Sequence, residues 1–366
     1  MHPLVWRSDG GADSLRPRLA NSNCDANRVD TVEPAVTRDA EHLVTLDDIR
    51  RARGQVAPHV RQTPIVPLAR DASEVGNERL FLKLDNLQVT GAFKVRAAFA
   101  IMHSLTPAER TRGIVLASSG NFGQAFAYAG RMMHSPIVVV MLRQSSPYKV
   151  QAAKAFGADV VMVDDALARQ PVVEKVAGER GMTAIDSWEH PSITRGHGCL
   201  GLEILEQFPE VETVLVPVSS GGGAAGVATA VKLARPDVKV IGVQPKRANA
   251  AYVSLQQGRP VVIDYWDSVA DGLSARSPGA FPFRHLQEYL DEIVLIEERD
   301  IADAFRTLLF RGKVLAEPAG VVASAGFLSG KVEAGRKTVA CVTGGNVTEA
   351  VVRHLLDVTR EDTPRK

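Results

Sequence analysis

A regular alternation of short apolar runs with helix-forming segments constrains the fold of this chain most. Three apolar runs of strand length occur at residues 113–117, 137–141 and 159–163. Segments of helical composition follow them at residues 123–131, 147–156 and 172–180. The same alternation resumes later, at residues 213–218, in a helix from Ala224, and at residues 238–243 and 338–342. Strand, helix and strand at this spacing predict an α/β fold with parallel twisted sheets flanked by helices.

Length and composition narrow the class of protein further. A chain of 366 residues is long for one small core, so we expect two lobes with a crevice between them. Basic and acidic residues nearly balance, 43 against 42, which favours neither a nucleic-acid partner nor a membrane surface. The apolar run at 136–142 is far too short to span a bilayer. Cys24, Cys199 and Cys341 are isolated, so we expect a cytoplasmic protein without disulfides or a zinc site.

The first forty residues differ in composition from the rest. Residues 1–40 mix Gly, Asp, Asn, Arg and Pro without apolar periodicity, and we predict a mostly disordered arm. A first helix is expected to begin after Thr45, the candidate N-cap, and to run to about Val56. Asp48 completes a capping box with Thr45.

Residues 82–96 are the most informative single stretch. A short apolar strand passes through a polar turn at Thr90-Gly91 and delivers Lys94 to the start of a helical pattern. Phe93 and Val95 surround this lysine with apolar groups, and desolvation lowers the pKa of an ammonium group. Such a lysine suits Schiff-base chemistry. The alternative is a lysine that snorkels from a helix N-terminus.

A glycine-rich loop, Ser219 to Gly226, follows one apolar run and opens a helix. Its backbone N–H groups, at the positive end of that helix, predict a cradle for an anion. Gly221, Gly223 and Gly226 also satisfy G-x-G-x-x-G, but Gln244 stands where a dinucleotide site requires an acidic residue. The loop is therefore interpreted as a cradle for a single phosphate. The alternative is a glycine turn that packs a helix onto a sheet.

Two further polar turns come directly after predicted strands. Ser118-Ser119-Gly120-Asn121 precedes a helix, and its polar groups suit a carboxylate and a ring hydroxyl, with an ordinary helix cap as the alternative. Thr343-Gly344-Gly345-Asn346 follows the last predicted strand. A hydroxyl there would point into the crevice where open α/β sheets bind ligands, and a plain tight turn is the alternative.

Taken together, these motifs resemble the threonine/serine dehydratase and serine racemase family of fold type II pyridoxal-phosphate enzymes. The resemblance covers roughly residues 45–356, with the motifs in the family's order. The matching pieces are Thr90 to Arg96, Ser118 to Gln124, Ser219 to Gly226, Glu317 to Gly320 and Thr343 to Asn346. The family's architecture implies a large cofactor-binding domain of residues 41–110 and 190–360 and a small domain of residues 111–189, with pyridoxal 5'-phosphate in the crevice.

The resemblance implies a role for each matched residue. Lys94 matches the Schiff-base lysine, which then acts as the base at the substrate Cα, and Phe93 precedes it in the cofactor-binding motif. Asn121 matches the asparagine at the cofactor's ring hydroxyl, and Thr343 the hydroxyl that faces the pyridine nitrogen. The phosphate loop corresponds to Ser219, Ser220, Gly221, Gly222 and Gly223. The substrate carboxylate would be held by Ser118, Ser119, Gly120, Asn121 and Phe122. Ser119 is also the candidate acid or base on the opposite face of the substrate, as in racemases.

Some residues depart from the family pattern. Ser219 and Ser220 begin a loop that is usually rich in consecutive glycines, and Phe122 makes the expected pocket more apolar. Racemases of this family bind a divalent cation through two carboxylates, whereas this chain has Gln244 and Ala250 there, so we expect no metal site.

Three polar residues near the motifs each allow more than one interpretation. Glu317 is expected to border the cofactor ring, with helix capping as its alternative. We interpret His190 and His197 as loop and cap residues rather than a metal pair, since no third ligand lies near them.

The expected function is a dehydratase, an ammonia-lyase that converts a β-hydroxy amino acid such as threonine or serine to a 2-oxo acid and ammonia. An amino acid racemase that uses Lys94 and Ser119 on opposite faces is the alternative. A non-catalytic protein that binds the cofactor or an amino acid is a third. The expected partners are a small amino acid substrate and further copies of the chain, as a homodimer or higher homo-oligomer, with neither nucleic acid nor membrane.

Overall fold

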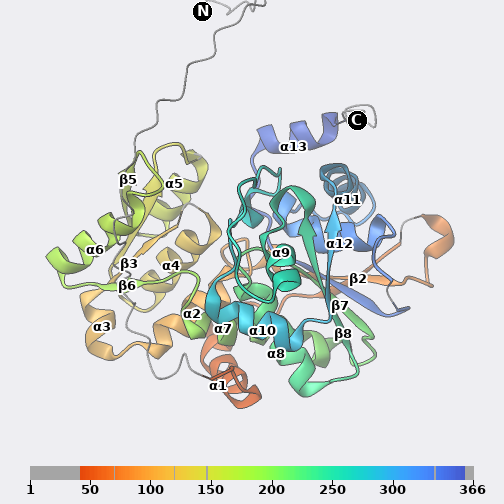
Figure 1. Ribbon diagram of the computed structural model, residues 1–366, viewed down its shortest axis with the longest axis horizontal. Coiled ribbons are helices and arrows are strands. Elements are labelled where there is room, and N and C mark those ends of the chain that lie inside the picture. Colours follow the sequence, from red (N-terminus) through yellow and green to blue (C-terminus); the bar gives the residue numbers. More distant parts are fainter. Residues whose placement is uncertain (1–41, 70, 119, 146, 334, 359–366) are drawn as a thin grey trace, which may run out of the picture. The chain divides into compact units, whose positions relative to one another are not determined.

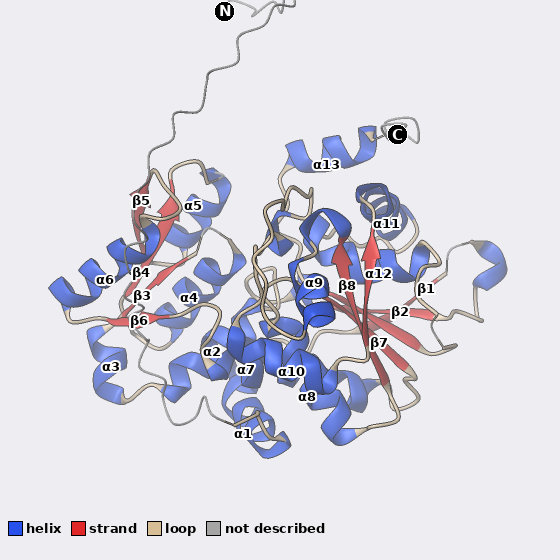
Figure 2. Ribbon diagram, viewed as in Figure 1, coloured by secondary structure: helices blue, strands red, loops and turns tan. Residues whose placement is uncertain are grey.

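The chain forms two sheets with helices on both sides of the strands (Figures 1 and 2). The computed structural model describes residues 42–358 except residues 70, 119, 146 and 334. The predictions for the arm of residues 1–40 and for Ser119 therefore lie outside the described residues. The prediction of a parallel α/β fold is confirmed.

The smaller sheet has four parallel strands in the order β5-β4-β3-β6. Its strands are β3 (Ile114–Ala117), β4 (Ile137–Leu142), β5 (Asp159–Val163) and β6 (Thr183–Ile185). The helices between them are α4 (Asn121–Met132), α5 (Pro147–Ala155) and α6 (Arg169–Arg180). Buried valines of β3 and β4 pack against α6, and the apolar side chains of α4 fill the space on the sheet's other side. The sequence pattern predicted all of these elements except β6.

The larger sheet has six strands in the order β1-β2-β10-β7-β8-β9. They are β1 (Ile65–Leu68), β2 (Leu80–Leu84), β7 (Thr213–Pro217), β8 (Lys239–Pro245), β9 (Glu292–Ile296) and β10 (Thr338–Val342). β1 runs antiparallel to β2 at one edge, and every other neighbouring pair is parallel. Helix α8 (Gly222–Ala234) packs on β7 and β8, and α12 (Pro318–Leu328) packs on β7 to β10.

The other helices surround these two sheets. They are α1 (Leu46–Val56), α2 (Lys94–Ser104), α3 (Pro107–Arg112), α7 (Pro191–Gln207), α9 (Ala250–Gln257), α10 (Ala280–Tyr289), α11 (Glu298–Phe310) and α13 (Glu349–Asp357). α1 begins after Thr45, whose side chain and that of Asp48 form the predicted capping box. The four-stranded sheet lies within residues 111–189 and the six-stranded sheet outside them. The domain boundaries themselves stay a prediction.

Strand direction explains why the predicted motifs can meet. The turn after Ala117 leaves β3, the loop after Pro217 leaves β7, and the turn after Val342 leaves β10, each at the carboxyl end of a strand. β7 and β10 are parallel neighbours, so their exits lie at the same sheet edge. A backbone bridge between Ala92 and Gly344 ties the segment before Lys94 to this edge.

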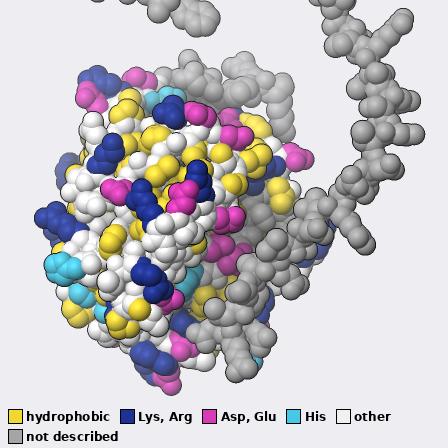
Figure 3. All heavy atoms as spheres, turned by 90° about the vertical axis from the view of Figure 1, so that its left-hand side faces the viewer, with side chains coloured by type: hydrophobic (Ala, Val, Ile, Leu, Met, Phe, Trp, Pro, Cys, Tyr) yellow, Lys and Arg dark blue, Asp and Glu magenta, His cyan; other side chains and the backbone are white. Residues whose placement is uncertain are grey.

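The surface charges and the lengths of the helices were both considered in the sequence predictions about partners. On the face drawn in Figure 3, basic and acidic side chains are interspersed with apolar and neutral ones. Among residues 42–358, as far as they are described, no helix combines the length and apolar character needed to cross a bilayer.

Candidate active site

Most of the residues predicted from the motifs line a single cavity of about 300 Å³. From the predicted set, the cavity wall contains Phe93, Lys94, Ser118, Gly120, Asn121, Phe122, Ser219, Ser220, Gly221, Gly223 and Thr343. Gly222 starts α8 behind this wall and does not line the cavity. The position of Ser119 lies outside the described residues, so its predicted roles stay predictions.

Lys94 is the first residue of α2 and lies between two aromatic rings. Its Nζ is 4.9 Å from the centroid of Phe93 and 5.7 Å from that of Phe122. Burial lowers the pKa of Lys94 to about 8, although the nearby charge of Glu317 acts in the opposite direction. A larger share of this amine is therefore neutral, and able to act as a nucleophile, than for an exposed lysine.

The glycine-rich loop leads from β7 into α8 with little room for side chains. Gly221 is the N-cap of α8 at φ 102°, a left-handed conformation that favours glycine, and no side chain caps the helix. A Cβ at Gly223 would lie 2.8 Å from the Phe93 ring, so this position also requires glycine. The first backbone N–H groups of a helix lack partners within it, and here they border the cavity. The loop is thus shaped for an anion such as a phosphate group.

The turn before α4 contributes backbone groups and one hydroxyl. Ser118 Oγ accepts a hydrogen bond from the N–H of Gly123 at 3.0 Å, so the side chain that borders the cavity also pairs with one N–H of the first turn of α4. The N-cap of α4 is Gly120, which has no side chain to close the helix end. This second helix N-terminus at the cavity suits a carboxylate group.

Asn121 is held from both sides by residues of distant segments. Its Nδ2 donates to Glu317 Oε1 at 2.6 Å, and its Oδ1 accepts from Asn346 Nδ2 at 2.9 Å. Asn346 Nδ2 also donates to the carbonyl of Thr90 at 2.9 Å. Sequence motifs predicted Asn121 as a site residue but gave no sign of this hydrogen-bonded chain.

Glu317 lines the cavity and does not cap α12. It is the N-cap residue of α12, but its carboxylate makes no capping bond and turns to Asn121 instead. Burial raises the pKa of Glu317 to about 7, and the charge of Asp271 adds to this rise. The alternative that Glu317 serves as a helix cap is therefore wrong.

Thr343 follows β10, lines the cavity and is hydrogen-bonded to the residue that precedes α2. Its carbonyl accepts the N–H of Phe93 at 2.9 Å, and its side chain is nearly buried at the cavity wall. Its position leaves a neutral hydroxyl, and not a carboxylate, at this part of the wall.

Two cavity residues were not predicted from the sequence. Lys149 on α5 and Asp271 in the short 3-10 helix Asp271–Leu273 form an ion pair of 2.6 Å between Nζ and Oδ2. Both residues line the cavity, and their ion pair connects α5 to the 3-10 helix Asp271–Leu273. Single charged residues in surface segments give no sequence signal that could have identified this pair.

The two histidines considered from sequence have different roles. His190 is the N-cap of α7, where its Nδ1 accepts from the N–H of Ser192 at 3.1 Å, as predicted. His197 is fully buried in the middle of α7 and stacks on Phe93 at 4.3 Å between ring centroids. The prediction that His197 is a loop or cap residue is therefore wrong. The helix was not recognised from the sequence because it is buried on nearly every side and so lacks an amphipathic pattern.

Gln244 lies at the end of β8, where the metal site of racemases was considered. Its Oε1 accepts the N–H of Tyr252 at 3.0 Å, and Ala250 begins α9 beside it. No group of three or more possible metal ligands occurs in the described part of the chain. The absence of a metal site stays a prediction.

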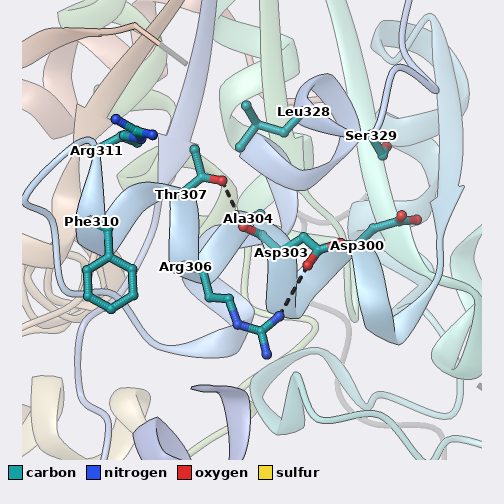
Figure 4. Close-up of a pocket in the computed structure, with 9 residues that line it drawn as sticks. All are labelled: Asp300, Asp303, Ala304, Arg306, Thr307, Phe310, Arg311, Leu328 and Ser329. Carbon is teal, nitrogen blue, oxygen red and sulfur yellow. Dashed lines mark hydrogen bonds and ion pairs between the residues drawn. The ribbon is translucent and has the colours of Figure 1, made fainter. Parts of the chain in front are cut away.

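A second hollow, of about 460 Å³, lies along α11 and is unrelated to the motifs. Figure 4 shows Arg306 turned toward Asp303 on the same helix, and Leu328 and Ser329 at the end of α12. The charged pair is local, with Arg306 Nη1 3.1 Å from Asp303 Oδ1. None of the residues predicted for catalysis lines this hollow.

The residues of the first cavity fit pyridoxal phosphate. Lys94 supplies an amine with a lowered pKa, and Gly221 and Gly223 belong to a loop with room for an anion, in which a Cβ at Gly223 would collide with the Phe93 ring. Asn121 and Thr343 supply neutral polar groups to the cavity wall. The fold and this site together define a class, an α/β enzyme built to hold a phosphorylated carbonyl cofactor on a lysine.

Comparisons with known proteins identify the family. The profile of the family described as "Pyridoxal-phosphate dependent enzyme" matches residues 56–344. L-threonine ammonia-lyase of Thermotoga maritima is 34% identical over 319 residues, 86% of this chain and 79% of that protein. L-threonine dehydratase catabolic TdcB of Staphylococcus aureus (strain USA300) is 33% identical over 333 residues, 88% of this chain and 96% of that protein.

Solved structures agree with this family. Maize serine racemase superposes with a TM-score of 0.81 at 30% identity, covering 86% of this chain and 97% of that one. The processed form of threonine deaminase isoform 2 from Solanum lycopersicum superposes with a TM-score of 0.78 at 27% identity, covering 86% of this chain and 94% of that one. The chain belongs to the pyridoxal-phosphate-dependent enzyme family, which confirms the predicted fold type and the predicted cofactor.

Proposed function

We propose that the protein is a pyridoxal-phosphate-dependent ammonia-lyase that converts a β-hydroxy amino acid such as threonine or serine to a 2-oxo acid and ammonia. The observation that carries this proposal is the pairing of Lys94 and Thr343 in one cavity. Similarity to L-threonine ammonia-lyase and L-threonine dehydratase over most of both chains supports it.

The proposed reaction divides the work between the cofactor and the chain. Pyridoxal phosphate supplies an electron sink that weakens the bonds at the substrate Cα. Lys94 would hold the cofactor and then take the Cα proton on its Nζ, which its lowered pKa favours. The amides of residues 219–223 would hold the phosphate group, and the N-terminus of α4 would orient the substrate carboxylate.

Thr343 and the apolar wall would direct the outcome of this reaction. A hydroxyl facing the ring nitrogen leaves that nitrogen uncharged, which makes the ring a weaker electron sink and favours rapid loss of the β-hydroxyl group. Phe122 and Leu273 give the cavity apolar surface, which suits a small neutral side chain more than a charged one.

Racemase activity is the second candidate. Its support is the similarity to maize serine racemase, at a TM-score of 0.81. A racemase needs a second acid or base on the face opposite Lys94, and Ser119 remains the proposed residue. A cytoplasmic location and a homo-oligomeric state also remain proposals. Two free buried thiols, Cys199 and Cys341, support the first, and light scattering would test the second.

Product analysis decides between these activities. The purified, cofactor-loaded protein is incubated with both enantiomers of a panel of β-hydroxy amino acids, and 2-oxo acid, ammonia and the chirality of the remainder are measured. We expect stoichiometric 2-oxo acid and ammonia from threonine or serine. Inversion of the amino acid without 2-oxo acid would contradict the lyase and establish the racemase. No change in any substrate would support the third alternative, a non-catalytic binding protein.

A further inference from the structure

The carboxylate of Glu317 is buried and held in place by specific contacts. It is only 8% exposed, and its Oε1 receives the 2.6 Å bond from Asn121 Nδ2. A Cβ at Gly344 would lie 2.0 Å from the same oxygen, so the glycine after Thr343 makes room for this carboxylate. A close contact of this kind fixes Glu317 against the turn that carries Thr343.

The hydrogen-bonded chain through Asn121 has one consistent direction. A backbone carbonyl accepts only, so the carbonyl of Thr90 requires the Nδ2 of Asn346 to face it. The other Nδ2 proton of Asn346 then faces Asn121 Oδ1 at 2.9 Å, with Gln124 Oε1 a more distant acceptor at 3.4 Å. This leaves Asn121 Nδ2 to face Glu317, and a flipped Asn121 amide would set its oxygen against the Glu317 carboxyl oxygen. Asn121 therefore keeps one N–H of its Nδ2 available as a donor at the cavity wall.

Three charged groups face Glu317 from three different elements. They are Lys94 of α2, Lys149 of α5 and Asp271 of the 3-10 helix Asp271–Leu273. Burial and the charge of Asp271 raise the pKa of Glu317, whereas the Asn121 hydrogen bond, Lys149 and Lys94 lower it, and the balance lies at about 7. Glu317 therefore gains or loses its proton near neutral pH.

We propose that Glu317 is a positioning residue that fixes Asn121 as a hydrogen-bond donor to the bound cofactor, and that the proton on Glu317 controls the electronic state of that cofactor. The inference rests on the proposed function only for the placement of the cofactor beside Lys94 and Asn121. When Glu317 is ionised, its charge stabilises a protonated nitrogen on Lys94 and strengthens the bond from Asn121. When it is protonated, both effects weaken.

The test is an absorbance titration of the cofactor-loaded protein from mildly acidic to mildly alkaline pH, with no amino acid present. As pH rises through about 7, Glu317 loses its proton, so we expect the cofactor band to change with a midpoint there. Glu317→Gln removes the titrating group while keeping an amide near Asn121, and the change should disappear. Glu349→Gln, at an exposed glutamate of α13, is the matched control and should titrate like the unaltered protein.

A second pair of variants keeps the test decisive if Glu317→Gln does not load the cofactor. Asp271→Asn removes a charge that raises the pKa of Glu317, so the midpoint should fall. Lys149→Met removes a charge that lowers it, so the midpoint should rise. Both substitutions break the same ion pair, so a purely structural effect would move the midpoints alike.

Two results would overturn the inference. One is an unchanged titration in Glu317→Gln, and the other is a failure of the Asp271 and Lys149 variants to move the midpoint in opposite directions. A cofactor band that is absent from the unaltered protein would contradict the proposed placement of the cofactor instead, so the two failures can be told apart.

Discussion

The lowered pKa of Lys94 comes from buried surroundings to which residues of two sequence motifs contribute. Phe93 precedes Lys94 with its ring centroid 4.9 Å from Nζ, and the ring centroid of Phe122, at the start of α4, lies 5.7 Å from Nζ. The aromatic surroundings replace water around Nζ, which accounts for a pKa of about 8. The positions of Phe93 and Gly223 depend on each other, because a Cβ at Gly223 would contact the ring.

This contact predicts the effect of Gly223→Ala. The added methyl group would lie 2.8 Å from Phe93 Cε2 and force the ring or the loop to move. Overpacking of this kind costs about 1–3 kcal/mol. We expect cofactor affinity to fall about 5- to 150-fold, measured by fluorescence titration. Gly178→Ala, in open space on α6, is the control and should leave affinity unchanged. Equal effects of both substitutions would contradict the cradle.

Among elements, α2 is anchored by a buried cluster of four charges. Arg96 donates from Nε to Asp85 at 2.7 Å and from Nη1 to Glu203 at 2.6 Å, and Lys83 Nζ lies 2.8 Å from Glu203 Oε2. Burial alone would raise the pKa of Asp85, but the Arg96 guanidinium holds it below its usual range. The cluster joins β2, α2 and α7, and so fixes the helix that begins with Lys94.

The cluster predicts unequal effects for two glutamates of α7. Glu203→Ala removes the carboxylate that Arg96 and Lys83 share. The buried Lys83 then loses its ion pair, and Arg96 keeps only the pair with Asp85. The free energy of unfolding should fall by about 3–5 kcal/mol. Glu206→Ala, three residues further on, removes a half-exposed pair with Arg53 and should cost about 1 kcal/mol or less. Denaturant unfolding measures both. Similar losses in the two variants would show that the cluster does not anchor α2.

Elements with clear periodicity were predictable, and those without it were not. The strands at 159–163 and 338–342 have the predicted bounds, and α2 begins at Lys94 as expected. β6 was missed because it has only three residues, and β9 because acidic residues flank its apolar run of four residues on both sides. α7 was missed because it is buried on nearly every side, which removes the amphipathic signal.

At the scale of the whole molecule, the cavity is made by segments far apart in the chain. Motifs predicted the residues after β3, β7 and β10, since each follows a recognisable strand. They could not predict the ion pair of Lys149 with Asp271, because its partners are 122 residues apart and neither lies in a motif. Its consequence for the site is that a second lysine, besides Lys94, lines the cavity.

The residue that carries the cofactor can be identified by chemical trapping. The loaded protein is reduced with borohydride, which makes the link between lysine and pyridoxal phosphate permanent, and is then digested and mapped by mass spectrometry. We expect a phosphopyridoxyl group on Lys94 and its loss in Lys94→Ala. Modification of Lys149 or another lysine, or of none, would contradict it.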